Sequence, residues 1–285
     1  MRAPGFFPLA SAVSAAMILT ATVLLVSAAE GTTVALWHMD ETSGDSVADA
    51  MGVHDGAASD APIVAGPNLP GLAGAANRAR QFDGSQTPPV SYIEVPDHAD
   101  WDLGSQFTLE AWAYPTEFLG ASIVRHFDAT DDNRSWWFGL YDQPEVHAAI
   151  SIGVDGNGSE LDKFGIVSPE DSVVLNQWQW FTATFDSGLL RLYIDGNPVA
   201  AGTVPVTSVF AADAPVWIGA SRANPGQPIT NSFPGLLDEV RILDLALSQE
   251  EVLDRYQSFF VPEASTGLLL AFGLVGVALR RRLST

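Results

Sequence analysis

Apolar and polar residues alternate in many short segments of this chain, and turn-forming residues separate these segments from Gly31 onward. The clearest case is Phe107–Tyr114, in which every second residue, beginning with Phe107, is apolar. A period of two is typical of a β-strand with one buried face and one partly wet face. The pattern therefore predicts an all-β domain of many short strands, packed as a sandwich.

The same pattern predicts further strands, two tight turns and one helix. The strand candidates are Ser91–Val95, Trp136–Tyr141, Ala148–Ile152, Trp180–Phe185, Leu189–Ile194 and Val216–Ala220. The sequences Asp-Ser-Gly at 186–188 and Asp-Gly-Asn at 195–197 predict hairpin turns. Ser248–Tyr256 has a helical pattern, with Ser248 as N-cap and Glu251 completing a capping box. We expect this helix to close the domain.

Residues 1–29 have the features of a secretory signal peptide. Arg2 precedes an apolar stretch that runs to Val26, and small residues follow it at the spacing of a cleavage site. A basic start, an apolar helix and small residues in this order form an export signal. Residues 30–258 are then expected to form one mature domain, since all-β domains of this length are common.

Residues 259–285 form a second distinctive segment, in which Pro262 and Glu263 precede an apolar run from Thr266 to Leu279. The run ends in three arginines, Arg280, Arg281 and Arg282. As a helix it would span ~21 Å, against ~30 Å for the hydrocarbon core of a bilayer. This is short for a permanent anchor, and arginines that stay inside would leave the upstream chain outside the cytoplasm.

This tail resembles the PEP-CTERM sorting signal of Gram-negative bacteria. Pro262 and Glu263 match its Pro-Glu motif, while Ala264 stands where the family pattern has proline. The resemblance implies cleavage near this motif by an exosortase, a membrane-embedded processing enzyme, so that contact with the membrane is transient. A plain C-terminal membrane anchor is the alternative interpretation. Either way, we expect a protein of the cell envelope, cell surface or extracellular matrix.

The composition limits the partners and the chemistry. The chain has 34 acidic and 13 basic residues, a formal net charge of −21, and no cysteine. Such an acidic chain repels nucleic acid, which is excluded as a partner. The absence of cysteine excludes disulfides, a thiol nucleophile and thiolate metal sites. The acidic excess is compatible with calcium sites, a saline habitat or simple solubility.

Several motifs occur in order between Val34 and Tyr256. They are Phe82-Asp83-Gly84, Trp112, Trp178, Asp195-Gly196 and the segment from Gly235 to Asp238-Glu239. Together with the segments around them, they resemble the LamG-like jellyroll family over nearly all of this range. The resemblance implies a concanavalin A-like sandwich of two antiparallel sheets, with one short helix near its C-terminal end and with the first and last strands side by side.

That adjacency suggests a calcium site. If Leu36–Asp40 pairs near Leu236–Arg241, then Asp40 and Asp238 converge at one edge of the sandwich, with Asp83 nearby. Calcium takes 6 to 8 oxygen ligands from carboxylates, carbonyls and water, and related jellyroll modules commonly carry one such ion. In the alternative interpretation these acids only cap a turn or lie on a solvated strand end.

Tryptophan is the candidate for ligand binding, and the chain has eight. Alternation sends Trp136 and Trp137 to opposite faces of a strand, and it places Trp180 opposite the apolar face of its own strand. Trp136 and Trp180 are therefore candidate platforms, since exposed indoles stack on the apolar faces of sugars. The alternative is that they belong to the core, as most tryptophans in a sandwich do.

The sequence lacks several motifs that are typical of catalytic sites. Gly-x-Ser-x-Gly, a phosphate-binding glycine loop and His-Glu-x-x-His do not occur, and the paired acids of a glycosidase strand are missing. Asp238 and Glu239 are adjacent, so strand alternation would point them to opposite faces. None of the five histidines, His38, His54, His98, His126 and His147, lies in a recognisable motif.

The sequence thus predicts an exported, non-catalytic module that binds an extracellular polysaccharide or a surface protein, with a possible structural calcium ion. One alternative is a structural matrix protein without a small ligand. A second is a polysaccharide-degrading enzyme on a concanavalin-like scaffold.

Overall fold

The structure of the protein is a computed structural model that describes residues 32–72, 74–128, 133–142, 146–152, 164–222 and 228–261. The described part belongs to one compact unit that begins at Gly31. The predicted signal peptide and the sorting residues Pro262, Glu263 and Arg280–282 lie outside the described residues. Within the described ranges, no helix has the length and apolar character needed to cross a membrane.

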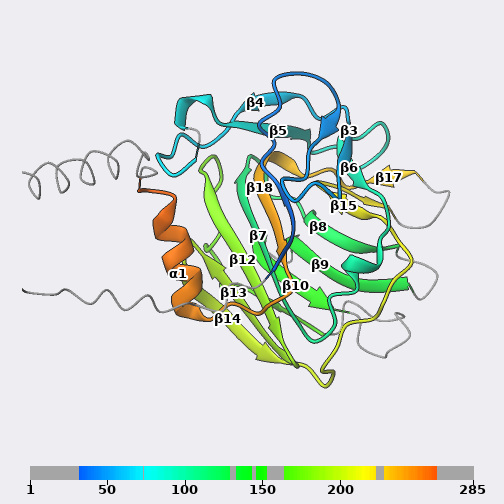
Figure 1. Ribbon diagram of the computed structural model, residues 1–285, viewed down its shortest axis with the longest axis vertical. Coiled ribbons are helices and arrows are strands. Elements are labelled where there is room, and N and C mark those ends of the chain that lie inside the picture. The colour runs from blue at the N-terminus through cyan, green and yellow to red at the C-terminus, as the bar shows by residue number, and fades with distance from the viewer. Residues whose placement is uncertain are drawn as a thin grey trace, which may run out of the picture. The chain divides into compact units, whose positions relative to one another are not determined.

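Two large antiparallel sheets make up the domain (Figure 1). Sheet A has the order β14 (Asn197–Thr203), β13 (Leu189–Ile194), β12 (Gln179–Asp186), β7 (Gln106–Pro115), β18 (Pro234–Leu243), β5 (Arg78–Asp83) and β4 (Ile63–Ala65), and β1 (Thr33–Trp37) also pairs with β18. Sheet B has the order β11 (Gly165–Val167), β10 (Val146–Ile152), β9 (Asn133–Asp142), β8 (Ala121–Asp128), β15 (Val216–Ile218), β6 (Tyr92–Val95), β3 (Gly56–Ser59) and β2 (Ser46–Val47). A small hairpin joins β16 (Ser221–Arg222) to β17 (Ile229–Thr230). Short 3₁₀ helices span Gly74–Ala76 and Ala99–Trp101.

The core lies between the two sheets, as the alternating pattern predicts. On β7, Phe107, Leu109 and their apolar partners face inward, and β12 contributes Phe181 and Phe185 to the same cluster. Sheet B closes the other side of this cluster with Phe138 and further apolar residues of β9. Burial of this apolar surface is the main driving force for the fold. All seven predicted strands are present, and the sandwich is confirmed.

A second apolar cluster covers the outer face of sheet A. Helix α1 (Gln249–Ser258) begins at Ser248 with the predicted capping box, and Figure 1 shows it lying along β12, β13 and β14. Its Val252 packs with Trp112 and Trp180, two outward residues of the sheet. Arg255 adds a two-point ion pair with the buried Glu110, at 2.6 and 2.8 Å. The helix therefore closes the domain by covering one end of this face.

The first and last strands of the domain are neighbours, as expected. Leu36 pairs with Arg241 and Trp37 with Val240, so that β1 continues the sheet where β5 ends along β18. The pattern did not predict β8, which carries Arg125, His126 and Asp128 in an otherwise apolar run. All eight residues of β8 are buried, and partners from other segments compensate its charges.

Candidate functional site

A β-bulge in β18 brings two acidic residues to the same side of the sheet. The pairing of β18 with β7 shifts register between Asp238 and Arg241, and Glu239 has a positive φ of 51°. Leu237 and Val240 on either side both belong to the core between the sheets. The extra residue of a bulge interrupts strict alternation. The expectation that Asp238 and Glu239 point to opposite faces is therefore wrong.

Of the acids near this bulge, Asp238 has the most strongly shifted pKa. It is fully buried, and its carboxylate accepts hydrogen bonds from Asn77 Nδ2 at 2.7 Å and from the backbone N–H of Glu239 at 2.8 Å. Burial, followed by the negative charge of Glu239, raises the pKa of Asp238 well above its ordinary value, and the charge of Asp40 adds to this. Asp40 and Asp238 thus lie close enough to interact, as the strand adjacency predicts.

The third predicted calcium ligand does not join this group. Asp83 pairs with Pro234, four residues before Asp238 on β18, which places it roughly 13 Å away along the strand. Its Oδ1 accepts hydrogen bonds from the backbone N–H groups of Ser85 and Ser91. The expected convergence of Asp83 with Asp40 and Asp238 is therefore wrong, because Asp83 instead orders the turn that follows β5.

The oxygen donors around Asp238 still suit a hard cation. Asp40 and Glu239 supply further carboxylates, and Asn77 Oδ1 is buried without a hydrogen-bond partner among the described residues. Carboxylate and amide oxygens are the ligands that calcium prefers. Glu239 is also held by His38, whose Nδ1 lies 2.7 Å from Glu239 Oε1. Calcium held by Asp40 and Asp238 stays a prediction.

We expect Asp238→Asn to raise the thermal midpoint at pH 7 when EDTA removes divalent cations. The folded-state pKa of Asp238 is raised, so the stability of the wild-type chain is greatest below the unfolded pKa and falls as pH rises through the folded value. The uncharged amide of asparagine removes this loss of stability, which is on the order of 1–3 kcal/mol for a poorly compensated buried group.

In millimolar calcium the thermal midpoint of the wild-type chain should rise, whereas that of Asp238→Asn should not.

Asp83→Asn is the matched control for this measurement. Burial raises the pKa of Asp83, but hydrogen bonds from Ser85, Ser232 and Ser91 outweigh it and lower the pKa overall. This variant should lower the midpoint at pH 7 and leave the response to calcium unchanged. A wild-type midpoint that calcium does not move would contradict the calcium prediction, and an Asp238→Asn midpoint below wild type in EDTA would contradict the charge argument.

Neither predicted indole platform is exposed. Trp136 is 0% exposed, faces the core beside Phe107 and donates its Nε1–H to the carbonyl of Trp101 at 3.1 Å. Trp180 is 1% exposed and faces outward, but Tyr256 of helix α1 stacks on it with ring centroids 6.0 Å apart. The expectation that these two residues present surface platforms is therefore wrong, because the sandwich interior covers one and α1 covers the other.

The neighbour of Trp136 is a partly accessible indole on the outer face of sheet B. Trp137 is half-buried on the outer face of sheet B, and its Nε1–H donates to Ser122 Oγ at 2.8 Å. Its ring lies over Gly139, where an added Cβ would approach Trp137 Cζ2 to 2.9 Å. Tyr141, on the same face of β9, is 47% exposed. Alternation from Trp136, Phe138 and Leu140 in the core is the sequence signal for this arrangement.

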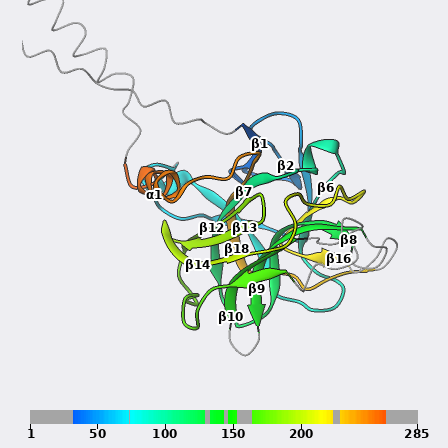
Figure 2. The same cartoon turned by 90° about the horizontal axis from the view of Figure 1, so that it is seen from below.

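Around β15, the outer face of sheet B is closed by its own contacts. Trp217 of β15 is fully buried beneath Arg222, whose guanidinium lies 4.8 Å from the indole. Arg222 also pairs with Asp128 at 3.0 Å. Figure 2 shows β16, which carries Arg222, alongside β8. Trp137 and Tyr141 lie on β9, beyond β8 from β15, and Tyr92 of β6 is also partly exposed on this face, beside Trp217.

Solved structures share this fold at low sequence identity. Domain 4 of AbnA, a GH43 extracellular arabinanase from Geobacillus stearothermophilus solved with arabinotriose, matches with a TM-score of 0.53 and 19% identity over 79% of this chain and 98% of that one. The binding domain of Paraclostridial Mosquitocidal Protein 1 matches with a TM-score of 0.55 and 16% identity over 81% and 52%. The binding domain of botulinum neurotoxin DC in complex with SialylT gives 0.56 and 13% over 81% and 52%. At these identities the similarity concerns the fold alone.

Family models agree with the architecture and with the tail. The PEP-CTERM protein-sorting motif matches residues 260–282, which indicates an exported protein. A model of the concanavalin A-like superfamily matches residues 87–253, more than half of the chain. With its two antiparallel sheets and its adjacent first and last strands, the chain belongs to the concanavalin A-like lectin/glucanases superfamily.

Proposed function

We propose that this protein is an exported, non-catalytic binding module that recognises extracellular polysaccharide or a surface protein through the outer face of sheet B. Trp137 is its main contact and Tyr141 its second. An exosortase of a Gram-negative-type bacterium processes the tail, so that the membrane holds the chain only transiently. The protein then acts in the cell envelope or the extracellular matrix.

The geometry of Trp137 carries this proposal. A sugar binds an indole through the flat face of the ring, and the binding is tighter when the ring is fixed beforehand. Ser122 Oγ holds the nitrogen side of the ring, and the bare backbone of Gly139 lets the ring lie close to the sheet. The ring is thus partly exposed and held in place, with a second aromatic residue four positions along the same strand.

The perturbed acids of this chain favour binding over hydrolysis. A glycosidase needs two carboxyl groups that flank the scissile bond, one of them with a raised pKa. Burial raises the pKa of Asp102 and Asp195, and it raises that of Asp238 the furthest. The side chain of Asp238 is fully buried, and Glu239 is itself buried beside it. A sugar cannot reach either group without local unfolding of β18.

The test is binding of the full chain to a polysaccharide array in millimolar calcium, followed by titration of each hit. We expect saturable binding that Trp137→Ala weakens at least tenfold, a loss of about 1.4 kcal/mol. Tyr141→Ala should weaken it less, because its contact is peripheral. Intrinsic tryptophan fluorescence of wild type and Trp137→Ala would show whether the ligand contacts this indole.

Trp178→Ala is the matched control, since Trp178 is a half-buried indole on the outer face of sheet A, beside Tyr114. It should leave the affinity unchanged. Equal binding by wild type and Trp137→Ala would move the site away from β9. A blank array with folded protein would overturn polysaccharide recognition, and release of new reducing ends would favour the enzymatic alternative. Calcium-dependent self-association without any ligand would favour the structural matrix role.

A further inference from the structure

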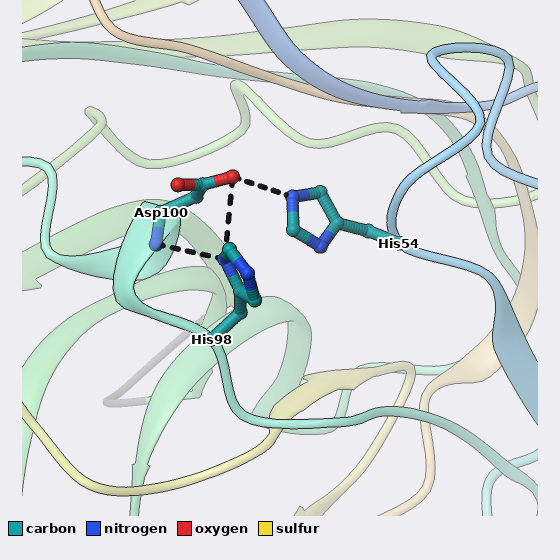
Figure 3. Close-up of side chains that lie close together, drawn as sticks. All are labelled: His54, His98 and Asp100. Atoms are coloured by element: carbon teal, nitrogen blue, oxygen red, sulfur yellow. Dashed lines mark hydrogen bonds and ion pairs between the residues drawn. The ribbon is translucent and has the colours of Figure 1, made fainter.

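Two histidines and an aspartate meet beside the 3₁₀ helix Ala99–Trp101, and none of them belongs to the groups around Trp137 or Asp238 described above. His54 comes from the loop between β2 and β3, while His98 and Asp100 come from the start of the 3₁₀ helix Ala99–Trp101 (Figure 3). One potential ligand atom from each residue lies within 4.8 Å of the other two. Among the described residues, this is the group of three histidine or acidic side chains that comes this close.

The backbone of His54 is held on both sides. Its N–H donates to Asp49 Oδ2 at 3.0 Å, and its carbonyl accepts from Trp37 Nε1 at 2.8 Å. Asp49 also accepts hydrogen bonds from the N–H groups of Met51 and Val53, which orders the whole loop. The imidazole packs against Trp101 with centroids 4.3 Å apart and is 4% exposed. His54 is therefore a pre-positioned donor with little freedom to turn away.

The other two donors lie on a short, well-anchored segment. His98 is the N-cap of the 3₁₀ helix, and its Nδ1 accepts from the backbone N–H of Asp100 at 3.2 Å. Trp101, in the same helix, is fully buried and donates its Nε1–H to the carbonyl of Pro96. The side chains of His98 and Asp100 are 49% and 48% exposed. They can adjust to a ligand, while the helix that carries them stays fixed.

Asp100 Oδ2 lies close to nitrogens of both histidines, an arrangement that a bound cation would stabilise. This oxygen lies 2.9 Å from His54 Nε2 and 3.2 Å from His98 Nδ1. When Nδ1 of His98 accepts the hydrogen bond from the backbone N–H of Asp100, it carries no proton, so Nδ1 and Asp100 Oδ2 are two acceptors 3.2 Å apart. Two acceptors at that distance repel each other unless a proton or a metal ion lies between them. A divalent ion would bind both histidines and the carboxylate at once, with His98 Nδ1 giving up its hydrogen bond to the backbone N–H of Asp100.

We propose that His54, His98 and Asp100 form a binding site for a divalent transition-metal ion, with Zn²⁺ as the natural occupant. Ligand atoms around tetrahedral zinc lie about 3.3 Å apart, given metal–ligand bonds of about 2.0–2.1 Å. The two distances to Asp100 Oδ2, 2.9 and 3.2 Å, are already close to that edge length. The fourth position faces solvent, because two of the three ligands are half exposed.

The donor types select this class of ion. Imidazole nitrogens suit zinc, copper and nickel, whereas calcium requires an all-oxygen shell. The net charge of −21 raises the concentration of any cation near the surface. When bound, the ion would join the loop after β2 to the helix before β7, two segments 44 residues apart at His54 and His98. Its role would be to stiffen this edge or to present an open coordination position to a partner.

The test uses the full chain without a histidine tag, titrated with Zn²⁺ by calorimetry and with Co²⁺ by visible absorption. We expect one ion per chain, a higher thermal midpoint in zinc, and the intense visible absorption of a four-coordinate Co²⁺ ion. His98→Ala and Asp100→Ala should each weaken zinc binding at least tenfold, and both are surface changes that leave the core intact. His54→Gln should do the same while keeping the volume of the buried side chain.

His38→Ala is the matched control, because His38 also lies beside a carboxylate, Glu239, but the described residues offer no third histidine or acid with its ligand atom within 4.8 Å of both. It should leave the affinity for zinc unchanged. Undiminished one-to-one binding by both His98→Ala and Asp100→Ala would overturn the proposal, as would the absence of zinc binding by the folded wild-type chain. Zinc binding is measured without any polysaccharide, so its result stands apart from the outcome of the polysaccharide array.

Discussion

Replacement of Gly235 by alanine is expected to prevent folding, or to lower the free energy of unfolding by more than about 4 kcal/mol. Gly235 lies in β18 between β5 and β7, paired with Phe82 on one side and Pro115 on the other. Its φ of 147° is disfavoured for any residue with a Cβ, and an added Cβ would overlap the carbonyl oxygen of Tyr114. Backbone on a central strand cannot give way without breaking its ladder.

Gly104→Ala separates the two causes of this destabilisation, the positive φ and the overlap with the carbonyl oxygen of Tyr114. Gly104 also has a positive φ, 66°, but an added Cβ would meet nothing within 4 Å. We expect this variant to cost only about 1–2 kcal/mol, the penalty for a left-handed residue. Denaturant unfolding followed by tryptophan fluorescence measures both values. Similar losses in the two variants would contradict the close approach of Tyr114.

The second large effect is expected for Trp180→Ala, which should lower the free energy of unfolding by about 3–5 kcal/mol. The indole is enclosed between sheet A and α1, with Tyr256 stacked on it and Phe259 packed edge-on at 5.5 Å. Its removal leaves a cavity beneath the helix and loosens the C-terminal closure of the domain. Urea denaturation measures the loss, and proteolysis near α1 should become faster.

Trp137→Ala supplies the comparison, since that indole is half-buried, with its Nε1–H bonded to Ser122 Oγ and its ring beside Gly139. It should cost less than about 1.5 kcal/mol while weakening ligand binding. Trp180→Ala should therefore mainly lower the stability of the domain, whereas Trp137→Ala should mainly weaken ligand binding. A stability loss below about 1 kcal/mol for Trp180→Ala would mean that α1 does not depend on this residue.

The local pattern of apolar, polar and capping residues was sufficient to predict most of the architecture. The alternation in Phe107–Tyr114 correctly assigns the inward face of β7, and the capping residues Ser248 and Glu251 correctly place the start of α1. The outer face of β7 is drier than predicted, because Thr108, Glu110 and Trp112 are buried as well. Strand faces and helix caps depend on residues that are close in sequence, so the period of a strand or helix is enough to predict them. β8 escaped detection because its charges interrupt the apolar pattern, and their partners, such as Arg222 for Asp128, lie about a hundred residues away.

The sequence by itself determined an exported sandwich, its core faces and its sorting tail, because periodicity and motif order are local properties of the chain. Only the tertiary structure decided which side chains are accessible and which functional groups meet. It buried Trp180 under α1, left Trp137 at the surface and separated Asp83 from Asp238. These outcomes depend on contacts between distant segments and on one bulge in β18, and no periodic pattern records either of them.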